Sequence, residues 1–510
     1  MKITIVDLLD QHARARGQEI CITDREGSWT YKKIQRASVK IARELRKLGV
    51  KKGDRIGLLT TNVIEYPIVV FAAWRIGAAI VPINHKLTWN EVEYVVEHAG
   101  INIGVYEADL KVAEGNELNE RGWITTREIG NIITTEERSD EEIINDSKAE
   151  DLAELLYTSG TTGKPKGCMH THRNVYMASM LTAAGFQLVG KDKILISMPI
   201  WHSSPMNNWL LGGIFVGAHI VLMKEYGPVE FIEYLEKYKI TLTFVAPIAL
   251  LMPINMGVKI DRRKLRNMRL TAYGGGPLGE DMVKVIEKKY GEIGLVQVYG
   301  MTETGPNGTA LYEWEGKGQE GSVGRSGTPG MEVEVRKRDG EVCSEGEIGE
   351  IYIRSPAMME GYWGDAAATS EVLDEEGWFR TGDIAKIKAG GYIYIMDRAK
   401  DMIITGGENV YSKEVEDAIG GYEDVLDVAV VGLEDKNWGE TVVAVIVKKK
   451  GSGEIEEELR KYVGARLAEY KQPRRYMWAE ELPRTPSGKL KKFDIREKIR
   501  GGQYETKARV

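Results

Sequence analysis

The stretch YTSGTTGKPKG spans Tyr157 to Gly167 and begins where the apolar run AELLY ends. That run predicts a buried strand, so the stretch is expected to be a loop at a strand end. Glycine lets the backbone approach a ligand closely, and successive backbone N–H groups can surround an anion. Lys164 and Lys166 add positive charge, but the P-loop spacing G-x-x-x-x-G-K-[ST] is absent. A phosphate-binding loop is favoured over a solvated linker, with candidate hydroxyl groups on Thr158, Ser159, Thr161 and Thr162.

The residues on both sides of this loop alternate between strand-like and helix-like patterns. Before it, DRIGLLT, AAIVPI and INIGVYEA predict strands, while VIEYPIVVFAAWRIG and TWNEVEYVVEHAG predict helices. The second helix opens with a Thr88–Glu91 capping box. After the loop, the predicted strands are KILISMPI, HIVLMK, LTFVAP, MRLTAYG and IGLVQVYG, with helices between them. Such alternation is typical of parallel sheets covered by helices.

The sequence pattern changes twice toward the C-terminus. Residues 321–397 contain short strand-like segments separated by glycine, and this pattern predicts antiparallel or barrel-like structure. The residues after them predict a compact α+β domain. The charged segment DRAKD, Asp397 to Asp401, is the expected boundary, giving domains 1–397 and 398–510. The predicted fold class is therefore α/β: a large N-terminal domain of two mixed, helix-flanked sheets plus a β-barrel-like subdomain, followed by a small α+β domain.

Composition excludes several classes of protein. The chain has 510 residues, 43% of them hydrophobic, and a net charge of −7, which argues against a nucleic-acid-binding domain. Its three cysteines, Cys21, Cys168 and Cys343, show no C-x-x-C spacing, so a reducing cytoplasm is favoured over a disulfide framework or a zinc site. We expect no signal peptide, because no charged leader precedes an apolar run. The apolar stretch after Tyr66 is interrupted by Arg75, so a buried helix is favoured over a membrane span.

A second glycine-rich turn lies between a predicted strand and a predicted helix. Gly274, Gly276 and Gly279 match the dinucleotide pattern G-x-G-x-x-G, and Glu303 lies roughly at the position of the ribose-binding carboxylate of that pattern. The match does not begin a compact βαβ unit near the start of a domain. A plain turn is therefore favoured, and an NAD-dependent dehydrogenase is a minority alternative.

Two histidine-containing segments have competing interpretations. His170 and His172 lack an evident third ligand, so a surface strand-to-helix junction is favoured over a metal site. His202 follows the predicted strand KILISMPI, and strand ends of parallel sheets face ligand crevices. A pocket wall and a packed loop are equally favoured for His202.

Six segments in order resemble the core motifs of one family. YTSGTTGKPKG, the GGGPL turn, VYGMTET, FRTGD, DRAKDMIITGGENVYSKEVE and PRTPSGKL are similar to those of the AMP-forming acyl-CoA synthetases, members of the adenylate-forming superfamily. The resemblance covers almost the whole chain. It implies that a carboxylate attacks the α-phosphate of ATP to give an acyl-adenylate, from which the CoA thiol displaces AMP. ATP, Mg²⁺ and coenzyme A are the implied cofactors, and an adenylation domain that loads a carrier protein is an alternative.

The resemblance also implies roles for single residues. Lys489 would bridge the carboxylate and the α-phosphate, Thr302 would lie near that phosphate, and Glu303 would hold Mg²⁺. The implied β- and γ-phosphate contacts are Thr158, Ser159, Gly160, Thr161, Thr162, Gly163 and Lys166. The implied adenosine contacts are Gly274, Gly275, Gly276, Pro277 and Tyr299 for adenine, and Asp383 with Arg398 for ribose.

In this family the small C-terminal domain rotates after adenylation, and Lys400 matches the pivot. The implied lining of the pantetheine tunnel is Gly406, Gly407, Glu408 and Trp438, with the basic cluster Lys471, Arg474 and Arg475 near the CoA phosphates.

The acyl pocket is expected around His202, Trp209, Gly274, Gly275, Met301 and Asn307, judging from where family pockets lie. His202, also counted among the catalytic residues, matches a position that is often histidine or aromatic in fatty-acid and aryl-acid ligases. The substrate favoured by this resemblance is a medium- or long-chain fatty acid, with an aromatic or alicyclic acid next. A homodimer is compatible with the sequence.

Overall fold

The computed structural model describes residues 4–116, 118, 120–135, 144–158, 165–276, 278–484 and 490–506. These residues belong to two compact units. The first is Met1–Val333 with Tyr352–Arg380, and the second is Glu334–Ile351 with Thr381–Val510.

The first unit contains a seven-stranded sheet that carries the ends of the opening loop. Its order is β17-β8-β7-β4-β3-β5-β6. The central strands β3, β4 and β5 are parallel, and β8 runs antiparallel to β7. The bounds are β3 Arg55–Leu59, β4 Ala79–Pro82, β5 Ile103–Tyr106, β6 Ile124–Thr125, β7 Leu152–Thr158, β8 Lys166–Thr171 and β17 Gly361–Tyr362. The buried strand predicted before the loop is β7.

The second sheet of this unit has eight strands in the order β14-β13-β12-β11-β9-β10-β1-β2. Strands β10, β9, β11, β12 and β13 pair in parallel, as the alternating pattern predicts. The bounds are β1 Ile20–Thr23, β2 Ser28–Thr30, β9 Lys193–Ile196, β10 His219–Leu222, β11 Leu242–Val245, β12 Leu270–Tyr273, β13 Leu295–Gly300 and β14 Gly308–Leu311.

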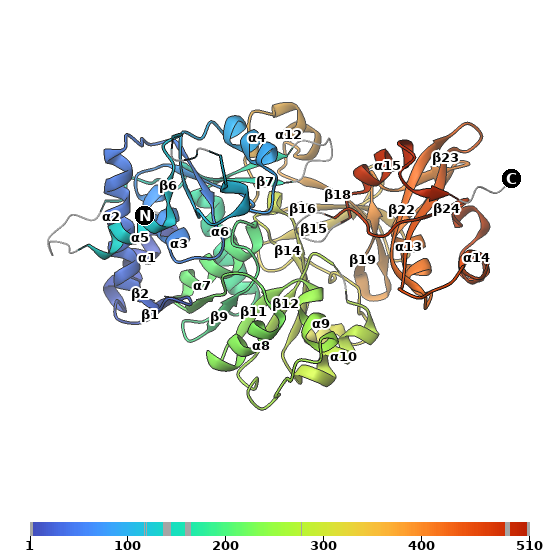
Figure 1. Ribbon diagram of the computed structural model, residues 1–510, viewed down its shortest axis with the longest axis horizontal. Helices are drawn as coiled ribbons and strands as arrows, with labels where there is room; N and C mark the ends of the chain where they lie inside the picture. The colour runs from blue at the N-terminus through green and yellow to red at the C-terminus, as the bar shows by residue number, and fades with distance from the viewer. Residues whose placement is uncertain are drawn as a thin grey trace. The chain divides into compact units, whose positions relative to one another are not determined.

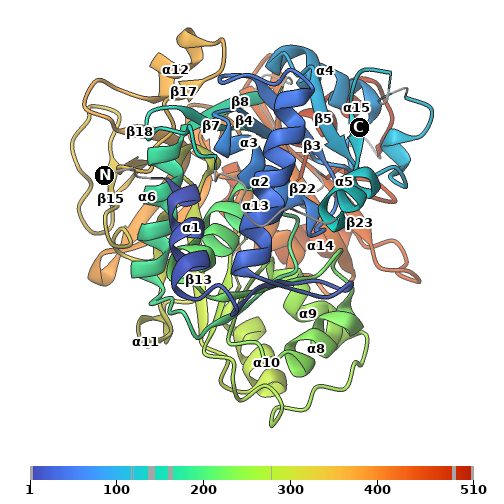
Figure 2. The same ribbon diagram turned by 90° about the vertical axis from the view of Figure 1, so that its left-hand side faces the viewer.

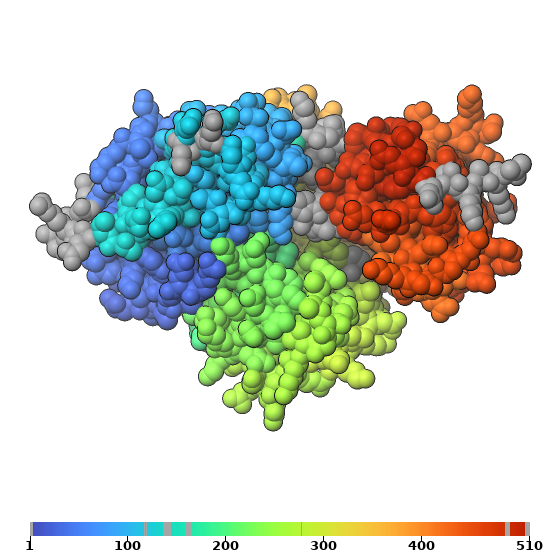
Figure 3. Space-filling view, in the orientation of Figure 1, coloured from blue at the N-terminus to red at the C-terminus, as the bar shows by residue number. Residues whose placement is uncertain are grey.

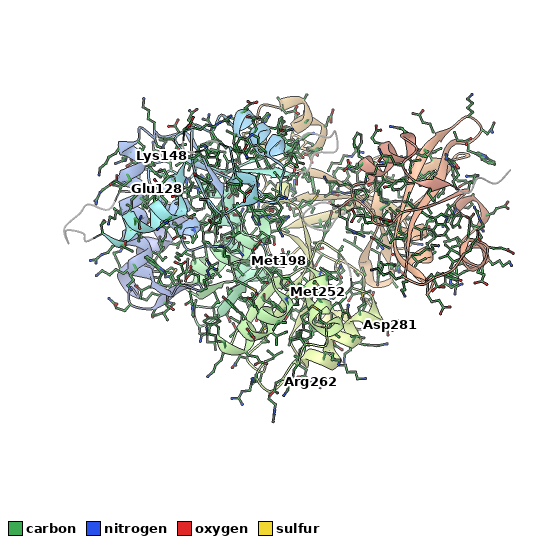
Figure 4. All side chains as sticks on the ribbon, in the orientation of Figure 1. Glu128, Lys148, Met198, Met252, Arg262 and Asp281 are labelled. Carbon is green, nitrogen blue, oxygen red and sulfur yellow. The ribbon has the colours of Figure 1, made fainter. Side chains whose placement is uncertain are left out.

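Helices lie on both faces of the second sheet. Helices α8 (Pro228–Lys237), α9 (Pro247–Asn255) and α10 (Glu280–Tyr290) cover one face, seen below β11 and β12 in Figure 1. Asp281 and Arg262 lie at the outer rim of this layer, whereas Met252 of α9 lies nearer the sheet (Figure 4).

A second helical layer shares one core with both sheets. It consists of α1 (Ile5–Ala15), α2 (Tyr31–Lys47), α3 (Glu65–Arg75), α6 (His172–Gly185), the π-helix η2 (Ser204–Leu210) and α7 (Leu211–Val216). Figure 2 shows α1 between α2 and α6. In the space-filling view, the blue-to-cyan residues around the first sheet adjoin the green residues of the second (Figure 3).

The core of this layer is apolar except where charge is paired. Arg75 is fully buried, and its Nη2 lies 2.6 Å from Asp10 Oδ1 while its Nε donates to Ser38. A buried charge is tolerated only when it is paired and hydrogen-bonded, which this arrangement provides. The arginine that interrupts the apolar stretch is thus the C-terminal residue of a buried helix. The predicted capping box also forms, at the start of α4 (Trp89–Ala99). Among the described residues, no helix has the length and apolarity needed to cross a membrane.

The second unit combines two sheets. One is four-stranded in the order β15-β16-β18-β19, with β18 and β19 antiparallel, and supplies the antiparallel structure expected from the glycine-punctuated region. The other has the path β21-β20-β23-β24-β25, with β22 paired to β23. The bounds are β15 Glu332–Arg336, β16 Ile348–Arg354, β18 Phe379–Lys388, β19 Tyr392–Arg398, β20 Ile403–Thr405, β21 Glu408–Val410, β22 Val425–Asp435, β23 Gly439–Lys448, β24 Arg475–Trp478 and β25 Glu505–Thr506.

Helices complete the α+β part of the second unit: α13 (Ser412–Gly420), α14 (Glu456–Gly464) and α15 (Lys492–Arg500). Helix α14 ends at Gly464, because glycine disfavours helix continuation. The four-stranded sheet belongs to the second unit together with the C-terminal residues. The hinge predicted at Lys400 stays a prediction.

Candidate active site

The opening loop joins two paired strands. Thr158 ends β7, Lys166 begins β8, and the two are cross-strand partners. The strand pair therefore fixes where the loop begins and ends. Eight residues of interest lie outside the described residues: Ser159, Gly160, Thr161, Thr162, Gly163, Lys164, Pro277 and Lys489.

Lys166 and Glu303 both contact the side chain of Tyr362. The Nζ of Lys166 lies 4.9 Å from the ring centroid of Tyr362, and the Tyr362 hydroxyl donates to Glu303 Oε1 over 3.0 Å. Glu303 is buried, and its carbonyl oxygen accepts the backbone N–H of Met359. A cation predicted to neutralise pyrophosphate and a carboxylate predicted to hold Mg²⁺ are thus neighbours.

Sequence reasoning missed Tyr362. This residue belongs to a two-residue strand, β17, that pairs with β8 at Cys168. So short a strand has no periodicity, and its partner lies almost two hundred positions away in sequence. No local pattern identifies the pairing.

Glu303 offers a carboxylate, the kind of ligand that Mg²⁺ prefers. Mg²⁺ is usually held by one or two carboxylates plus substrate phosphates. The described part of the chain contains no cluster of three or more His, Cys, Asp or Glu side chains that could enclose a metal. A magnesium site at Glu303 stays a prediction.

Thr302 is held from two sides. Its Oγ1 lies 3.0 Å from Ser203 Oγ, at the start of η2, and its carbonyl oxygen accepts from His170 Nε2 over 2.9 Å. Burial lowers the pKa of His170 to about 4, so its ring is neutral near pH 7. Because Nε2 donates to a carbonyl oxygen, the neutral ring carries its proton on Nε2. The buried His170 thus holds Thr302 of the VYGMTET segment in place.

The expected surface position of His170 and His172 is wrong. Both are 1% exposed, although they do lie at the β8–α6 junction. The His172 ring packs edge-on against Trp74 at 5.3 Å. The junction is buried because α3 places Trp74 over it. The polar sequence around the junction does not predict this tertiary contact.

The residues expected around the acid lie along η2 and beside the β12 turn. Trp209 stacks on Phe244, with ring centroids 5.7 Å apart and planes at 12°. A Cβ on Gly274 would lie 2.9 Å from the Val298 carbonyl oxygen and 3.4 Å from Phe244 Cε2, so only glycine fits there. Gly275 has φ +81° and open space on its Cβ side, which leaves the backbone approachable.

The other residues expected at the pocket differ in exposure. His202, Met301 and Tyr299 are half-buried. Asn307 is buried, and its amide accepts from Thr182 Oγ1 and donates to the carbonyl oxygens of Ala178 and Gly305. These bonds hold the segment after VYGMTET against α6. A substrate contact for Asn307 stays a prediction.

In the second unit, the two predicted ribose-binding residues form an ion pair. Asp383 on β18 and Arg398 on β19 are cross-strand partners, with Nε to Oδ1 at 3.1 Å. Arg398 Nη1 also donates to the Thr381 carbonyl oxygen. The segment FRTGD lies within β18, where Gly382 has φ +73°.

The residues expected along the pantetheine path also gather in the second unit. Gly406 and Gly407, both with positive φ, form the turn between β20 and β21. A Cβ on Gly406 would lie 3.1 Å from the Trp438 ring, and the Arg474 guanidinium stacks over that ring at 4.1 Å. Glu408 and Lys400 are exposed. Lys471 is ion-paired with Glu414 at 2.7 Å.

Two protein-family models match this chain. Residues 9–363 match the model of the AMP-binding enzyme family, and residues 414–489 match the model of the AMP-binding enzyme C-terminal domain. The chain belongs to the AMP-binding enzyme family. Within that family it is an AMP-forming acid–CoA ligase, as the resemblance of its motifs predicts. The match also leaves the dehydrogenase interpretation of Gly274–Gly279 without support.

Similar proteins act on chemically different acids. A long-chain-fatty-acid–CoA ligase of Mycobacterium tuberculosis is 33% identical, over 92% of each chain. A feruloyl-CoA synthase of Amycolatopsis is 32% identical, over 92% of this chain and 94% of that protein. Among solved structures, the o-succinylbenzoate CoA synthetase of Bacillus subtilis in complex with ATP and magnesium is 27% identical, with a TM-score of 0.86 over 97% of this chain and 99% of that one.

Proposed function

We propose that this AMP-binding enzyme activates a carboxylic acid with an apolar body, foremost a medium- or long-chain fatty acid. A carboxylate oxygen attacks the α-phosphorus of ATP, and pyrophosphate leaves with the electrons of the broken P–O bond. The CoA sulfur then attacks the acyl carbon, its proton is lost, and AMP leaves.

The contact of Lys166, Tyr362 and Glu303 carries this proposal. Negative charge grows on the departing pyrophosphate, and preorganised cations and donors stabilise such charge most effectively. Lys166 supplies one cation at the loop end. A magnesium ion on Glu303, when bound, would supply Lewis-acid neutralisation of the phosphates. Tyr362 keeps the carboxylate oriented by donating a hydrogen bond to it.

The remaining residue roles are proposed on the strength of the family match. Lys489 bridges the carboxylate and the α-phosphate, and Thr302 binds that phosphate. Asp383 holds the ribose hydroxyls with Arg398 beside it. Lys400 is the pivot about which the C-terminal domain turns. Trp438 and the Gly406–Gly407 turn line the path of pantetheine.

An aromatic acid is the second candidate. Phe244, on which Trp209 stacks, lies 3.4 Å from the position of a Gly274 Cβ, and one relative is a feruloyl-CoA synthase. We also propose a cytoplasmic location, which the free, buried state of Cys21, Cys168 and Cys343 supports.

A product assay tests this function. The full chain is mixed with ATP, Mg²⁺, CoA and single acids from a panel of straight-chain, phenyl-substituted and hydroxycinnamic acids. We expect acid-dependent formation of equal amounts of AMP and acyl-CoA with at least one apolar acid. Formation of ADP, or no product with any acid of the panel, would refute the proposal.

A further inference from the structure

Two side chains of α4 contact the opposite ends of the opening loop. Tyr94 and His98 lie four positions apart, so they share one face of this helix. The Tyr94 hydroxyl donates to the Pro165 carbonyl oxygen over 3.2 Å, just before β8 begins. His98 Nδ1 lies 2.8 Å from the hydroxyl of Tyr157, on the strand β7 that leads into the loop. One helix face therefore reaches both ends of the loop.

The three rings at this contact also pack on one another. Tyr94 stacks on His98 with ring centroids 5.3 Å apart and planes at 23°, and His98 meets Tyr157 edge-on at 5.8 Å. Tyr157 lies close to Gly167, its cross-strand partner on β8, where a Cβ would come within 3.2 Å of the Tyr157 ring. Glycine at this position therefore leaves room for the ring between α4 and β8.

Helix α4 is anchored at both ends and along one side. Its start carries the capping box of Thr88 and Glu91, and it ends at Gly100, whose φ of +64° suits glycine. The His98 carbonyl oxygen accepts from Trp363 Nε1 over 3.2 Å, directly after β17. The buried face of the helix packs into the apolar core beside the first sheet and consists of Val92, Val95, Val96 and Ala99. The helix is thus a fixed support for the two contacts with the loop.

We propose that Tyr94 and His98 are positioning residues for nucleotide binding, which hold the two ends of the loop in place for the β- and γ-phosphates of ATP. This inference rests on the proposed function, in which the loop binds those phosphates. A loop whose ends are fixed loses less conformational freedom when a ligand binds. Such preorganisation raises affinity without adding a contact to the ligand. Neither side chain needs to touch the nucleotide for this effect.

Loss of these contacts should affect ligands selectively. ATP and inorganic pyrophosphate carry the phosphates that the loop binds, whereas AMP carries only the α-phosphate. A loop with one end released should therefore bind ATP and pyrophosphate more weakly and leave AMP binding unchanged. General damage to the fold would weaken the binding of all three ligands.

The test is isothermal titration calorimetry of the full chain with ATP, inorganic pyrophosphate and AMP, each in the presence of Mg²⁺. Tyr94→Phe keeps the ring and removes only the hydroxyl that reaches Pro165. It should raise the Kd of ATP and of pyrophosphate by about two- to tenfold, which corresponds to one net hydrogen bond, and leave the Kd of AMP unchanged. His98→Phe keeps a ring but removes the nitrogen that contacts Tyr157, and it should have the same selective effect from the other end of the loop.

Tyr312→Phe is the matched control. It removes a tyrosine hydroxyl that donates to the Gly185 carbonyl oxygen over 3.0 Å in the same unit, and it should leave all three affinities unchanged. Unchanged ATP and pyrophosphate affinities in folded Tyr94→Phe or His98→Phe, or an equal loss of AMP affinity, would overturn the inference while leaving the ligase function intact. A natural protein that binds neither ATP nor pyrophosphate would refute the proposed function instead.

Discussion

Replacing Glu154 with glutamine should remove a pH dependence from the stability of the first unit. Glu154 lies on β7 and is fully buried. Its Oε1 accepts from Asn207 Nδ2 over 2.6 Å, whereas neither Glu154 Oε2 nor Asn207 Oδ1 has a hydrogen-bond partner among the described residues. Burial raises the pKa of this carboxyl to about 8, although the bond from Asn207 opposes the shift. Glu154 is therefore protonated in the folded protein near pH 7.

The size of the effect follows from proton linkage. The unfolded chain loses this proton near the ordinary carboxyl pKa of about 4.3, whereas the folded protein keeps it to about pH 8. Between these values folding takes up a proton, so the free energy of unfolding falls as pH rises, by about 1.4 kcal/mol per unit. Relative to Glu154→Gln, the natural protein should lose about 3 kcal/mol between about pH 5 and pH 7.5.

Urea unfolding of both proteins across that pH range, followed by tryptophan fluorescence, measures this difference. Glu97→Gln, on an exposed position of α4, is the matched control for the substitution itself. A stability difference between the natural protein and Glu154→Gln that does not change with pH would refute the assignment of a protonated Glu154.

Three further predictions concern the site and its support. Tyr362→Phe should slow acyl-adenylate formation by about tenfold or more, because Glu303 loses the hydrogen bond that the Tyr362 hydroxyl donates. The reaction of supplied acyl-adenylate with CoA should be unchanged. Equal loss in the two half-reactions would point to a structural role. Lys489→Ala should slow adenylation by roughly 10²–10³ and spare thioester formation, as separate half-reaction assays would show. The free energy of unfolding of His172→Leu should depend less on pH between about 6.5 and 4. Burial lowers the pKa of His172 to about 4, so the natural protein loses stability as pH falls through this range. Acid-unfolding curves that coincide for the two proteins would contradict this.

The elements of the fold were predictable where the sequence has a strong local period. The apolar run before the loop, the capping box at Thr88 and the alternating strands of the second sheet all appear as expected. Sheet order was not predictable, because β1 and β2 join the edge of a sheet whose other strands come much later in the chain. Local pattern carries no information about such long-range pairing.

The site was predictable as a set of motifs but not as contacts. Thr302, Glu303 and Lys166 were identified from motif resemblance, whereas Tyr362, which links the last two, was not. The burial of His170 escaped prediction because its polar neighbours in sequence are not its neighbours in space. The stacking of Trp209 on Phe244 depends on a π-helix meeting β11, and no sequence period marks that meeting.

Exchange of labelled pyrophosphate into ATP in the absence of CoA tests the central claim most directly. A ligase that forms an acyl-adenylate must reverse this step when pyrophosphate is supplied. We expect exchange that requires an accepted acid and Mg²⁺ and that does not require CoA. Exchange that is absent without CoA, for an acid that the complete reaction converts to acyl-CoA and AMP, would contradict an acyl-adenylate intermediate.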